Sequence, residues 1–319
     1  MRNIDKNQKW LKPFLILVVI FCTSCTPTKQ KILDAEHAYF GQKPPGLIPE
    51  VFAPGIISVD STIEHGSPAF SPDGNEVFWQ SNLRKKDKDT QIYVMTMRHE
   101  GGQWSTSEQT SYGSMPAFSL DGKRLYFQVI DKEQGDALYF IEKCGMNWSE
   151  PKRMNLIDHF PELKYAYALS FTHSGTLYFF GHAESLESMN NFGIYRSEFI
   201  DGAYARPKLL PPNINAGKGV LNWTPFIAPD ESYLLFSSNR FNDQQDIYIC
   251  FRQSDGSWTE AVSLGVAINT NRGERFPTVS PDGKYLFFTR WVAPGNEDVL
   301  WVSTKVIDRI KNIELIIHY

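Results

Sequence analysis

Ser67-Pro68-Ala69-Phe70-Ser71-Pro72-Asp73-Gly74 is the first of five similar stretches that decide the fold of this 319-residue chain. Each copy has a short apolar run, a turn resembling Ser-Pro-Asp-Gly, and then a second apolar run that is rich in aromatic residues. The other copies occupy residues 115–122, 168–175, 224–231 and 276–283. The motif therefore recurs roughly every 50 residues, which indicates a repeat architecture rather than a chain of unrelated segments.

Each repeat divides into four predicted strands. The first is small and apolar, as a strand beside a crowded central axis would be, and the Pro-Asp-Gly order after it is typical of a tight type I turn. The second strand is the aromatic run, whose bulky residues on both faces indicate burial on both sides. A third strand follows a polar loop, and the fourth is marked by Trp104, Trp148, Tyr204 or Trp258. We therefore predict an all-β protein, a single β-propeller of four-stranded antiparallel blades.

The fifth repeat lacks its fourth strand, and the N-terminal part of the chain offers a replacement. No Trp-containing strand follows Trp301, whereas residues 49–58, before the first repeat, resemble residues 261–268 at the corresponding place in the fourth. An N-terminal strand that completes the last blade would close the ring and remove the exposed edges of an open sheet. The motif count predicts five blades. Six is the alternative if residues 26–60 or 302–319 contain a degenerate blade.

The N-terminus is predicted to be a lipoprotein signal peptide. Positive residues up to Lys12 precede the apolar run 14–21, which is too short to span a bilayer. The following Cys22-Thr23-Ser24-Cys25 resembles a bacterial lipobox, and this resemblance implies that Cys25 becomes the lipidated first residue of the mature protein. The expected division of the chain is a signal peptide at 1–24, a lipidated tether at 25–46 and the propeller at 47–319.

Composition and charge exclude some function classes. The chain is 42% hydrophobic and 14% aromatic, enough for a packed core, and its formal net charge is −4. Arg2, Lys6, Lys9 and Lys12 against Asp5 give +3 within the first 24 residues, which leaves the remainder near −7. Nucleic-acid binding requires clustered basic residues, so we expect no nucleic-acid partner.

Two further cysteines, Cys144 and Cys250, lie in different repeats that are not neighbours in sequence. In a propeller their strands would be about two blades apart, farther than the Cα separation of about 7 Å that a disulfide permits. We predict two free thiols that behave as buried, small hydrophobic residues.

Ser237-Ser238-Asn239-Arg240, followed by Asp246-Ile247-Tyr248, resembles the Ser-Asn-Arg…Asp-Ile-Tyr signature of the PD40, or WD40-like, repeat family. That family includes the TolB propeller, which binds partner proteins in the envelope, and the propellers of prolyl-oligopeptidase-type enzymes. The resemblance covers residues 49–305. Together with the lipobox, the chain resembles small propeller lipoproteins of Bacteroidota. This implies a monomer attached through its lipid to the outer membrane, facing the periplasm or the cell surface.

The sequence contains no pattern that indicates catalysis. It has no Gly-x-Ser-x-Gly elbow and no histidine pair with metal-ligand spacing, so we expect no catalytic residue, metal or cofactor. In the predicted blade the first strand begins, and the second ends, at one face, where the variable connections gather. We call this the variable face. Its candidate ligand-binding residues are His65, Tyr167, Asn222, Trp223, Asn239, Arg240, Glu274, Arg275 and Arg290.

The preferred interpretation is a non-catalytic binding module for an envelope protein segment or a small ligand. The alternative is a carbohydrate-active hydrolase or lyase with its site at the channel mouth, where carboxylates from different blades would meet. A structural scaffold in an envelope complex is a third interpretation. Converging ionisable groups with opposed pKa shifts would favour an enzyme. The aromatic residues also have a structural interpretation as a plug for the channel, and Asn239-Arg240 as a brace between blades.

Overall fold

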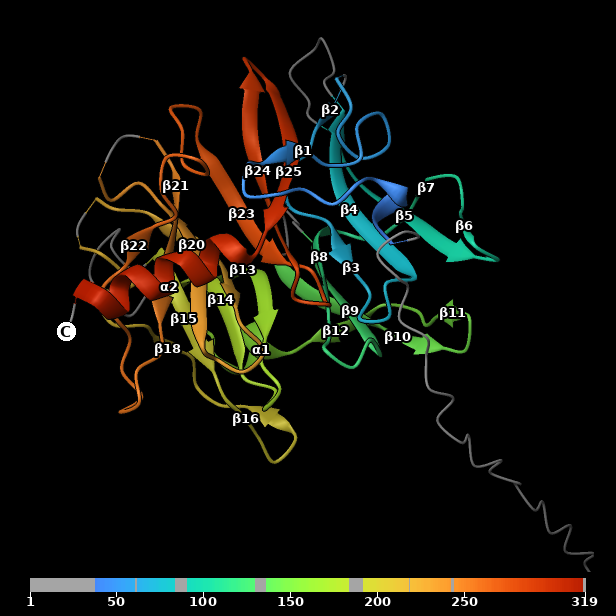
Figure 1. Ribbon diagram of the computed structural model, residues 1–319. Helices are drawn as coiled ribbons and strands as arrows, with labels where there is room; N and C mark the ends of the chain where they lie inside the picture. Colours follow the sequence, from blue (N-terminus) through green and yellow to red (C-terminus); the bar gives the residue numbers. More distant parts are fainter. Residues whose placement is uncertain are drawn as a thin grey trace, which may run out of the picture. The chain divides into compact units, whose positions relative to one another are not determined.

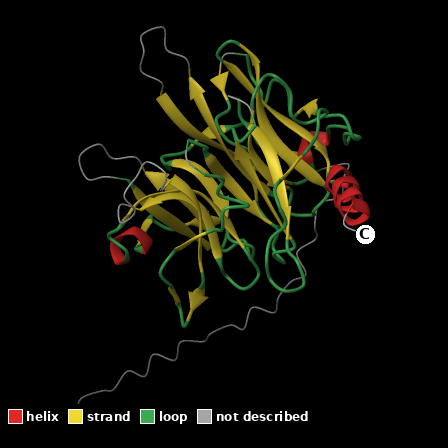
Figure 2. Cartoon of the chain, turned by 90° about the vertical axis from the view of Figure 1, so that its left-hand side faces the viewer, coloured by secondary structure: helices red, strands yellow, loops and turns green. Residues whose placement is uncertain are grey.

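The computed structural model describes residues 38–60, 62–83, 91–129, 136–183, 192–217, 219–241 and 244–317. Strands make up nearly all of its regular structure, and the helices lie at the periphery (Figure 2). The prediction of an all-β protein is confirmed. The predicted signal peptide, Cys25 and most of the tether lie outside the described residues.

The strands form successive antiparallel units that follow the sequence repeat (Figure 1). In repeat 2, β8 (Ser114–Phe118) pairs with β9 (Arg124–Val129), β9 with β10 (Ala137–Cys144), and β10 with both β11 (Asn147–Trp148) and β12 (Lys152–Met154). The corresponding strands are β3 (Ala69–Phe70), β4 (Glu76–Leu83), β5 (Gln91–Glu100), β6 (Gln103–Trp104) and β7 (Glu108–Gln109) in repeat 1; β13 (Leu163–Phe171), β14 (Leu177–Ala183), β15 (Phe192–Ser197) and β18 (Lys208–Leu209), with the hairpin β16 (Phe199–Ile200) and β17 (Ala203–Tyr204), in repeat 3; β19 (Asn222–Ile227), β20 (Tyr233–Ser238), β21 (Asp246–Phe251) and β22 (Val262–Ser263) in repeat 4; and β23 (Glu274–Val279), β24 (Tyr285–Ala293) and β25 (Asn296–Ser303) in repeat 5.

The first two strands of the described chain belong to the sheet of the last repeat. β1 (Glu50–Val51) pairs antiparallel with β25, in the register Glu50↔Trp301 and Val51↔Leu300. β2 (Thr62–Ile63) pairs antiparallel with β4 of repeat 1 and parallel with β25 of repeat 5. The N-terminal segment therefore lies where the fourth strand of repeat 5 is missing, and it joins repeats 5 and 1 in one sheet.

Side chains of the Ser-Pro-Asp-Gly motif hold the turn between the first and second strands. In repeat 1, Asn75 N–H donates to Asp73 Oδ1 at 3.1 Å and Glu76 N–H donates to Ser71 Oγ at 2.9 Å. Gly74 has φ 74°, a left-handed conformation that glycine adopts without steric cost. Equivalent contacts recur in repeats 2 and 5, so the predicted tight turns are present.

Five clusters of buried apolar side chains each lie between two repeats. Adjacent residues of the second strand contribute to different clusters because their side chains point to opposite faces. The prediction that this strand is buried on both sides is therefore confirmed. Representative members are Phe78 and Leu125 (repeats 1 and 2), Tyr126 and Phe179 (repeats 2 and 3), Tyr178 and Phe236 (repeats 3 and 4), Leu235 and Phe288 (repeats 4 and 5), and Phe287 and Val77 (repeats 5 and 1).

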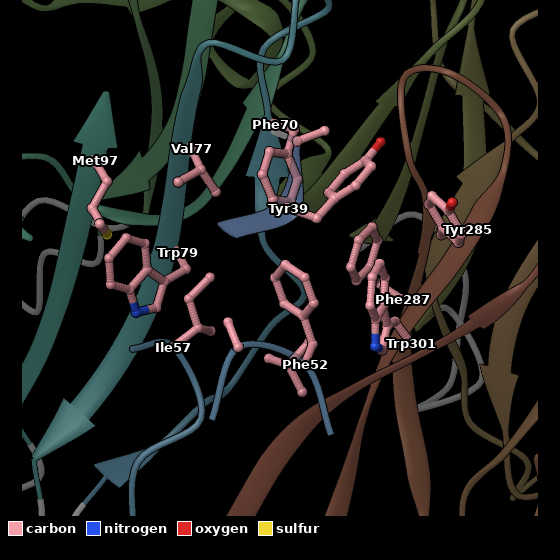
Figure 3. Packing of buried hydrophobic residues seen from close by; sticks show 13 residues of the cluster. Tyr39, Phe52, Ile57, Phe70, Val77, Trp79, Met97, Tyr285, Phe287 and Trp301 are labelled. Atoms are coloured by element: carbon pink, nitrogen blue, oxygen red, sulfur yellow. The ribbon is translucent and has the colours of Figure 1, made fainter. Parts of the chain in front are cut away.

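The cluster between repeats 5 and 1 also includes the N-terminal segment. Figure 3 shows Phe52 and Tyr39 between side chains of repeat 1 and those of repeat 5. The ring of Phe52 lies 4.9 Å from that of Phe287 and 5.1 Å from that of Trp301, measured between centroids. Tyr39 Oη donates to Asp282 Oδ1 at 3.0 Å, which fixes the start of the described chain beside the turn of repeat 5.

Besides the short 3₁₀ helix η1 (Tyr39–Gly41), the described chain has two α-helices, α1 (Leu156–His159) and α2 (Lys305–Ile317). Val306 and Ile307 of α2 pack against the cluster between repeats 4 and 5. Among the described helices, none has both the length and the apolar character needed to traverse a membrane.

The two predicted thiols differ in burial. Cys250 is a free, buried thiol near the end of β21, as predicted, whereas Cys144 is free but exposed, so its predicted burial is wrong. Cys144 is the last residue of β10 and pairs only with Asn147 of the outer hairpin, beyond the stretch of β10 that pairs with β9. It therefore lies outside the clusters that bury the middle of each strand.

Removal of the Phe52 ring is expected to destabilise the protein strongly. Phe52 is 0% exposed and contacts aromatic rings from both repeats, so Phe52→Ala should lower the free energy of unfolding by about 3–5 kcal/mol. Ile56→Ala, at an exposed side chain in the same segment, should change it by less than about 0.5 kcal/mol. Urea unfolding at equilibrium measures both. Equal, small changes would show that the N-terminal segment does not belong to the core.

Candidate functional site

Arg240 is engaged in contacts within the protein. Its guanidinium donates to the carbonyl oxygens of Asn213 (3.2 Å) and Ile214 (2.6 Å) and to Asn222 Oδ1 (2.9 Å). It also stacks over the rings of Phe236 and Tyr248. Burial lowers the pKa of Arg240. These contacts tie the connection between repeats 3 and 4 to repeat 4, as a brace would.

Asn222 and Asn239 take part in the same local network. Asn239 Oδ1 accepts a hydrogen bond from Leu221 N–H at 2.8 Å, and Ser238 Oγ donates to Asn222 Oδ1 at 2.9 Å. Both amides therefore hold the start of β19 against the end of β20.

Arg290 and Glu274 form a buried ion pair in repeat 5. Arg290 Nε lies 2.7 Å from Glu274 Oε1, and the other carboxylate oxygen accepts a hydrogen bond from Thr270 N–H at 2.9 Å. Arg290 Nη2 donates to Ile268 O at 2.7 Å. Burial raises the pKa of Glu274, although Thr270 and Arg290 oppose this shift. The pair fixes the connection between repeats 4 and 5.

A third network lies where β2 meets β25. Glu297 Oε2 is 2.6 Å from Arg275 Nη2 and 3.4 Å from His65 Nδ1, and Glu297 Oε1 accepts a hydrogen bond from Thr289 Oγ1. Burial would raise the pKa of Glu297, but His65 and Arg275 outweigh it, and the pKa is lowered. Glu297 is therefore held as a carboxylate although its side chain is 0% exposed.

The pKa of Glu64, beside this network, is shifted in the opposite direction from that of Glu297. Its backbone N–H donates to Glu297 O at 3.1 Å, and its side chain is fully buried. Burial raises the pKa of Glu64 to about 8, the negative charges of Asp298 and Glu297 add to the rise, and a hydrogen bond from Thr62 opposes it. Glu64 Oε2 has no hydrogen-bond partner among the described residues. We call the residues Thr62, Glu64, His65, Arg275, Thr289 and Glu297 the seam network.

Aromatic side chains gather at the central axis beside the seam network. Tyr167, Phe180 and Phe276 are buried together, with Trp223 packed against them. The ring of Phe276 lies 4.7 Å from that of His65, 6.4 Å from that of Tyr167 and 6.3 Å from that of Trp223. Four of the nine predicted residues, His65, Tyr167, Trp223 and Arg275, therefore meet around Phe276. We call Tyr167, Phe180, Trp223 and Phe276 the axial aromatic cluster.

A repeated backbone irregularity shapes the axis. Met115, Ala168, Thr224 and Phe276 occupy equivalent positions in four first strands, and all have left-handed φ values, between 48° and 54°. Each lies at a shift of register in its strand pairing, as in a β-bulge. A left-handed conformation is unfavourable for a β-branched or bulky residue. Because it recurs at the equivalent position of four first strands, we regard this bulge as a regular feature of the repeat. All four residues line the cavity below.

An axial cavity of about 370 Å³ extends from the axial aromatic cluster to the Ser-Pro-Asp-Gly turns. The first strands of all five repeats line it, with residues such as Ala69, Ala117, Leu169, Phe226 and Val279. We call the surface formed by the turns the turn face. The rim there includes the exposed residues Leu120, His173 and Pro281. The sequence offered one signal for this cavity, the small apolar first strands, but we predicted a ligand site only at the variable face.

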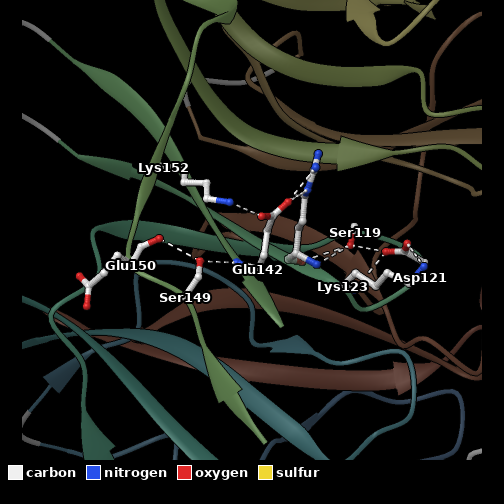
Figure 4. Close-up of polar contacts among 8 residues, drawn as sticks. Ser119, Asp121, Lys123, Glu142, Ser149, Glu150 and Lys152 are labelled. Atoms are coloured by element: carbon white, nitrogen blue, oxygen red, sulfur yellow. Dashed lines mark hydrogen bonds and ion pairs between the residues drawn. The ribbon is translucent and has the colours of Figure 1, made fainter. Parts of the chain in front are cut away.

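A groove of about 710 Å³ continues from the axial cavity between repeats 2 and 3. The two share Ser119, Leu120, Phe171 and His173. The polar side of the groove carries paired groups, and Figure 4 shows Glu142 between Lys152 and the strand that begins after Ser119 and Asp121. Glu142 Oε1 accepts hydrogen bonds from Arg124 Nε and Nη2 at 3.0 and 2.9 Å. The described residues contain no group of three or more histidine, cysteine or acidic side chains placed to hold a metal ion.

No protein-family model matches the chain, and no curated protein matches it. Among solved structures it is similar to a TolB protein from Agrobacterium tumefaciens, with 19% identity and a TM-score of 0.46 over 71% of this chain and 69% of that chain. It is also similar to TolB from Acinetobacter baumannii (18%, 0.44, 74% and 53%) and to a gluconolactonase from Xanthomonas campestris (13%, 0.43, 81% and 94%). The chain spans about half the length of the Acinetobacter protein. Similarities this distant transfer neither an activity nor a functional residue.

The pH dependence of stability should reveal the state of Glu64. Its folded pKa of about 8 is above the ordinary value of 4.5, so the folded protein keeps a proton that the unfolded chain releases. This contribution to stability is complete below pH 4.5 and declines as the pH rises to about 8, by about 1.4 kcal/mol per pH unit. Glu64→Gln should remove this pH dependence.

Urea unfolding of the native protein and of Glu64→Gln between pH 5 and 8 measures the difference. The variant should gain stability relative to the native protein as the pH rises. Parallel profiles would contradict a protonated Glu64. Ile56→Ala, at an exposed side chain, changes no ionisable group, so it is the control and should leave the shape of the profile unchanged.

Proposed function

We propose that this protein is a five-bladed β-propeller in which β1 completes the fifth blade. Three observations support the proposal. Five repeats each supply three consecutive antiparallel strands, β1 pairs with the outer side of β25, and five apolar clusters link successive repeats and also the last with the first. A ring of this kind leaves its first strands around an axis, in agreement with the residues that line the axial cavity.

We further propose that the propeller is anchored through a lipid on Cys25 to the outer membrane, facing the periplasm or the cell surface. The lipobox-like Cys22–Cys25 supports the anchor. Tyr39, near the start of the described chain, donates a hydrogen bond to Asp282 in the turn of repeat 5, which supports an anchor attached beside the turn face. Tyr39 follows Cys25 by 14 positions, a span of roughly 45–50 Å if fully extended.

The function that the geometry supports best is non-catalytic binding of a ligand or protein segment that enters the axial cavity from the turn face. The observation that supports this function is a difference in chemistry between the variable face and the turn face. The charged candidates Arg240, Arg275, Glu274 and Arg290 of the variable face are already paired within the protein. The cavity at the other end is open and apolar, and its volume lies within the range of small-molecule sites.

A hydrolase or lyase is the second candidate, because one observation favours it. Glu64 and Glu297 are neighbouring carboxyl groups whose pKa values are shifted in opposite directions, the arrangement that separates a general acid from a base. Both side chains are buried, however, and neither lines the axial cavity or the groove. Release of reducing ends from envelope polysaccharides, lost in both Glu64→Gln and Glu297→Gln, would support this candidate instead.

A comparison of the two faces tests the binding function. The immobilised full chain would be exposed to envelope extract, and retained proteins and small molecules would be identified by mass spectrometry. Ala69→Trp, which fills the axial cavity, should reduce the retained ligand at least tenfold, whereas Arg240→Lys and Trp223→Phe on the variable face should retain it. Loss of the ligand only in the variable-face variants would move the site to the face predicted from sequence. No retained ligand in any form would contradict a binding module.

A further inference from the structure

We propose that the axial cavity binds the hydrocarbon chain of a single-chain, fatty-acid-like amphiphile from the membrane to which the protein is anchored. This inference rests on the proposed binding function and names the chemical class of its ligand. It is carried by three observations: the chemistry of the cavity wall, the side of the protein on which the cavity opens, and the polar groove that continues from it.

Most polar side chains of the cavity wall are hydrogen-bonded within the protein, although the buried Thr278 Oγ1 has no hydrogen-bond partner among the described residues. Gln80 Oε1 accepts a hydrogen bond from Met115 N–H at 3.3 Å, and Gln80 Nε2 donates to Asn82 Oδ1 at 3.2 Å. Thr224 Oγ1 pairs with Ser237 Oγ at 2.8 Å, and Ser170 Oγ accepts from Ile227 N–H at 3.0 Å. What remains to contact a ligand is mainly proline, alanine, leucine and aromatic surface.

Such a wall favours a hydrocarbon chain over a peptide. Every residue of a peptide brings one N–H donor and one carbonyl acceptor into the cavity. Groups that lose water without gaining a partner cost free energy, and here most wall side chains that could pair with them, with the exception of Thr278, are already hydrogen-bonded. A methylene chain has no such groups and gains free energy from each CH₂ that leaves water.

The cavity opens at the turn face, beside which the first described residues lie. Tyr39 contacts Asp282 at the turn of repeat 5, and the neighbouring turn residues Ser280, Pro281 and Gly283 line the cavity. The same side carries exposed apolar side chains outside the rim, including Met146 and, in the projecting β16–β17 hairpin, Phe199 and Ile200 (Figure 1). The proposed lipid anchor, joined to the chain ahead of Tyr39, would therefore be attached beside this opening.

The groove between repeats 2 and 3 supplies a place for the polar head. It begins at Ser119 and Leu120, where the axial cavity ends, and leads past Lys123, Arg124 and Lys143. Lys123 is the most accessible of these cations, with its side chain 79% exposed and its partner Asp121 only 3.6 Å away at the surface. Arg124 and Lys143 are paired with Glu142 and Glu76, so an anionic head at this point would share the exposed Lys123 with Asp121 while its chain occupies the apolar cavity.

Calorimetric titration with alkanoates tests the proposal. The full chain with Cys25→Ser would be used, so that no acyl group of its own competes, and each alkanoate would be kept below its micellar concentration. Dodecanoate should bind with one site per chain. From octanoate to dodecanoate, each pair of added methylenes should lower Kd roughly tenfold, until the chain fills the cavity.

Three variants locate the site. Leu120→Asp places a charge at the rim on an exposed side chain, and Ala69→Trp fills the cavity, so each should raise the Kd of dodecanoate at least tenfold. Val266→Asp makes a matched aliphatic-to-acid change at a side chain that is 92% exposed and lines none of the cavities described, so Kd should stay within twofold. Leu120→Asp does not disturb the core, and it decides the question even if Ala69→Trp fails to fold.

The outcomes separate this inference from the binding function. An absent chain-length dependence, an unchanged Kd in Leu120→Asp, or displacement of dodecanoate by an equimolar apolar tetrapeptide amide would overturn the acyl-chain ligand. If alkanoates do not bind but Ala69→Trp still abolishes retention of another ligand from envelope extract, this inference fails and the binding function stands. If alkanoates do not bind and no other ligand is retained in a way that depends on the axial cavity, both the acyl-chain inference and the binding function fail.

Discussion

The antiparallel pairing of β1 with β25 is the contact on which the rest of the structure depends. It covers the outer edge of the last sheet, which would otherwise present unpaired N–H and C=O groups. The same segment carries Phe52 into the cluster between the last and first repeats and leads into β2, which hydrogen-bonds to both. One short segment thus provides the pairing, the apolar packing and the sheet connection between the two ends of the repeat array. The seam network is formed where these connections meet.

The placement of five first strands around one cavity creates a second constraint, the space left between them. Small residues such as Ala69 and Ala117 alternate there with larger ones, and together their side chains do not fill this space. The left-handed residues in four first strands answer this constraint at one level only, where Phe276 joins the other rings of the axial aromatic cluster. Below that level the side chains of the first strands, among them Leu169 and Phe226, surround the cavity without filling it. Four equivalent residues thus adopt the same unfavourable backbone conformation, at the level where the axial aromatic cluster closes the axis.

Much of the fold could be predicted from the sequence because its signals are local and repeated. The aromatic run predicts a strand buried on both sides, and the Ser-Pro-Asp-Gly order predicts the turn because Ser71 and Asp73 bind backbone groups within five residues. The pairing partners of charged residues were not predictable, since Arg240 binds carbonyls 26 and 27 positions away and Glu297 binds His65 across 232 positions. The exposure of Cys144 was not predicted, because assignment to a strand does not show where that strand extends beyond the strand it pairs with. The left-handed bulges were missed as well, because Met115 and Phe276 each precede a proline and look extended.

The two ends of the axis differ in what a ligand would have to displace. At the variable face, a ligand that binds Arg240 or Arg275 must compete with buried hydrogen bonds and an ion pair, and each broken contact leaves a buried group without a partner. At the turn face, a ligand in the axial cavity displaces water mainly from apolar surface, which is favourable. The charged residues that the sequence singled out as ligand-binding candidates are thus engaged in contacts that stabilise the fold. The accessible apolar surface lies in the axial cavity, beside the turns. This asymmetry is why we assign binding to the turn face.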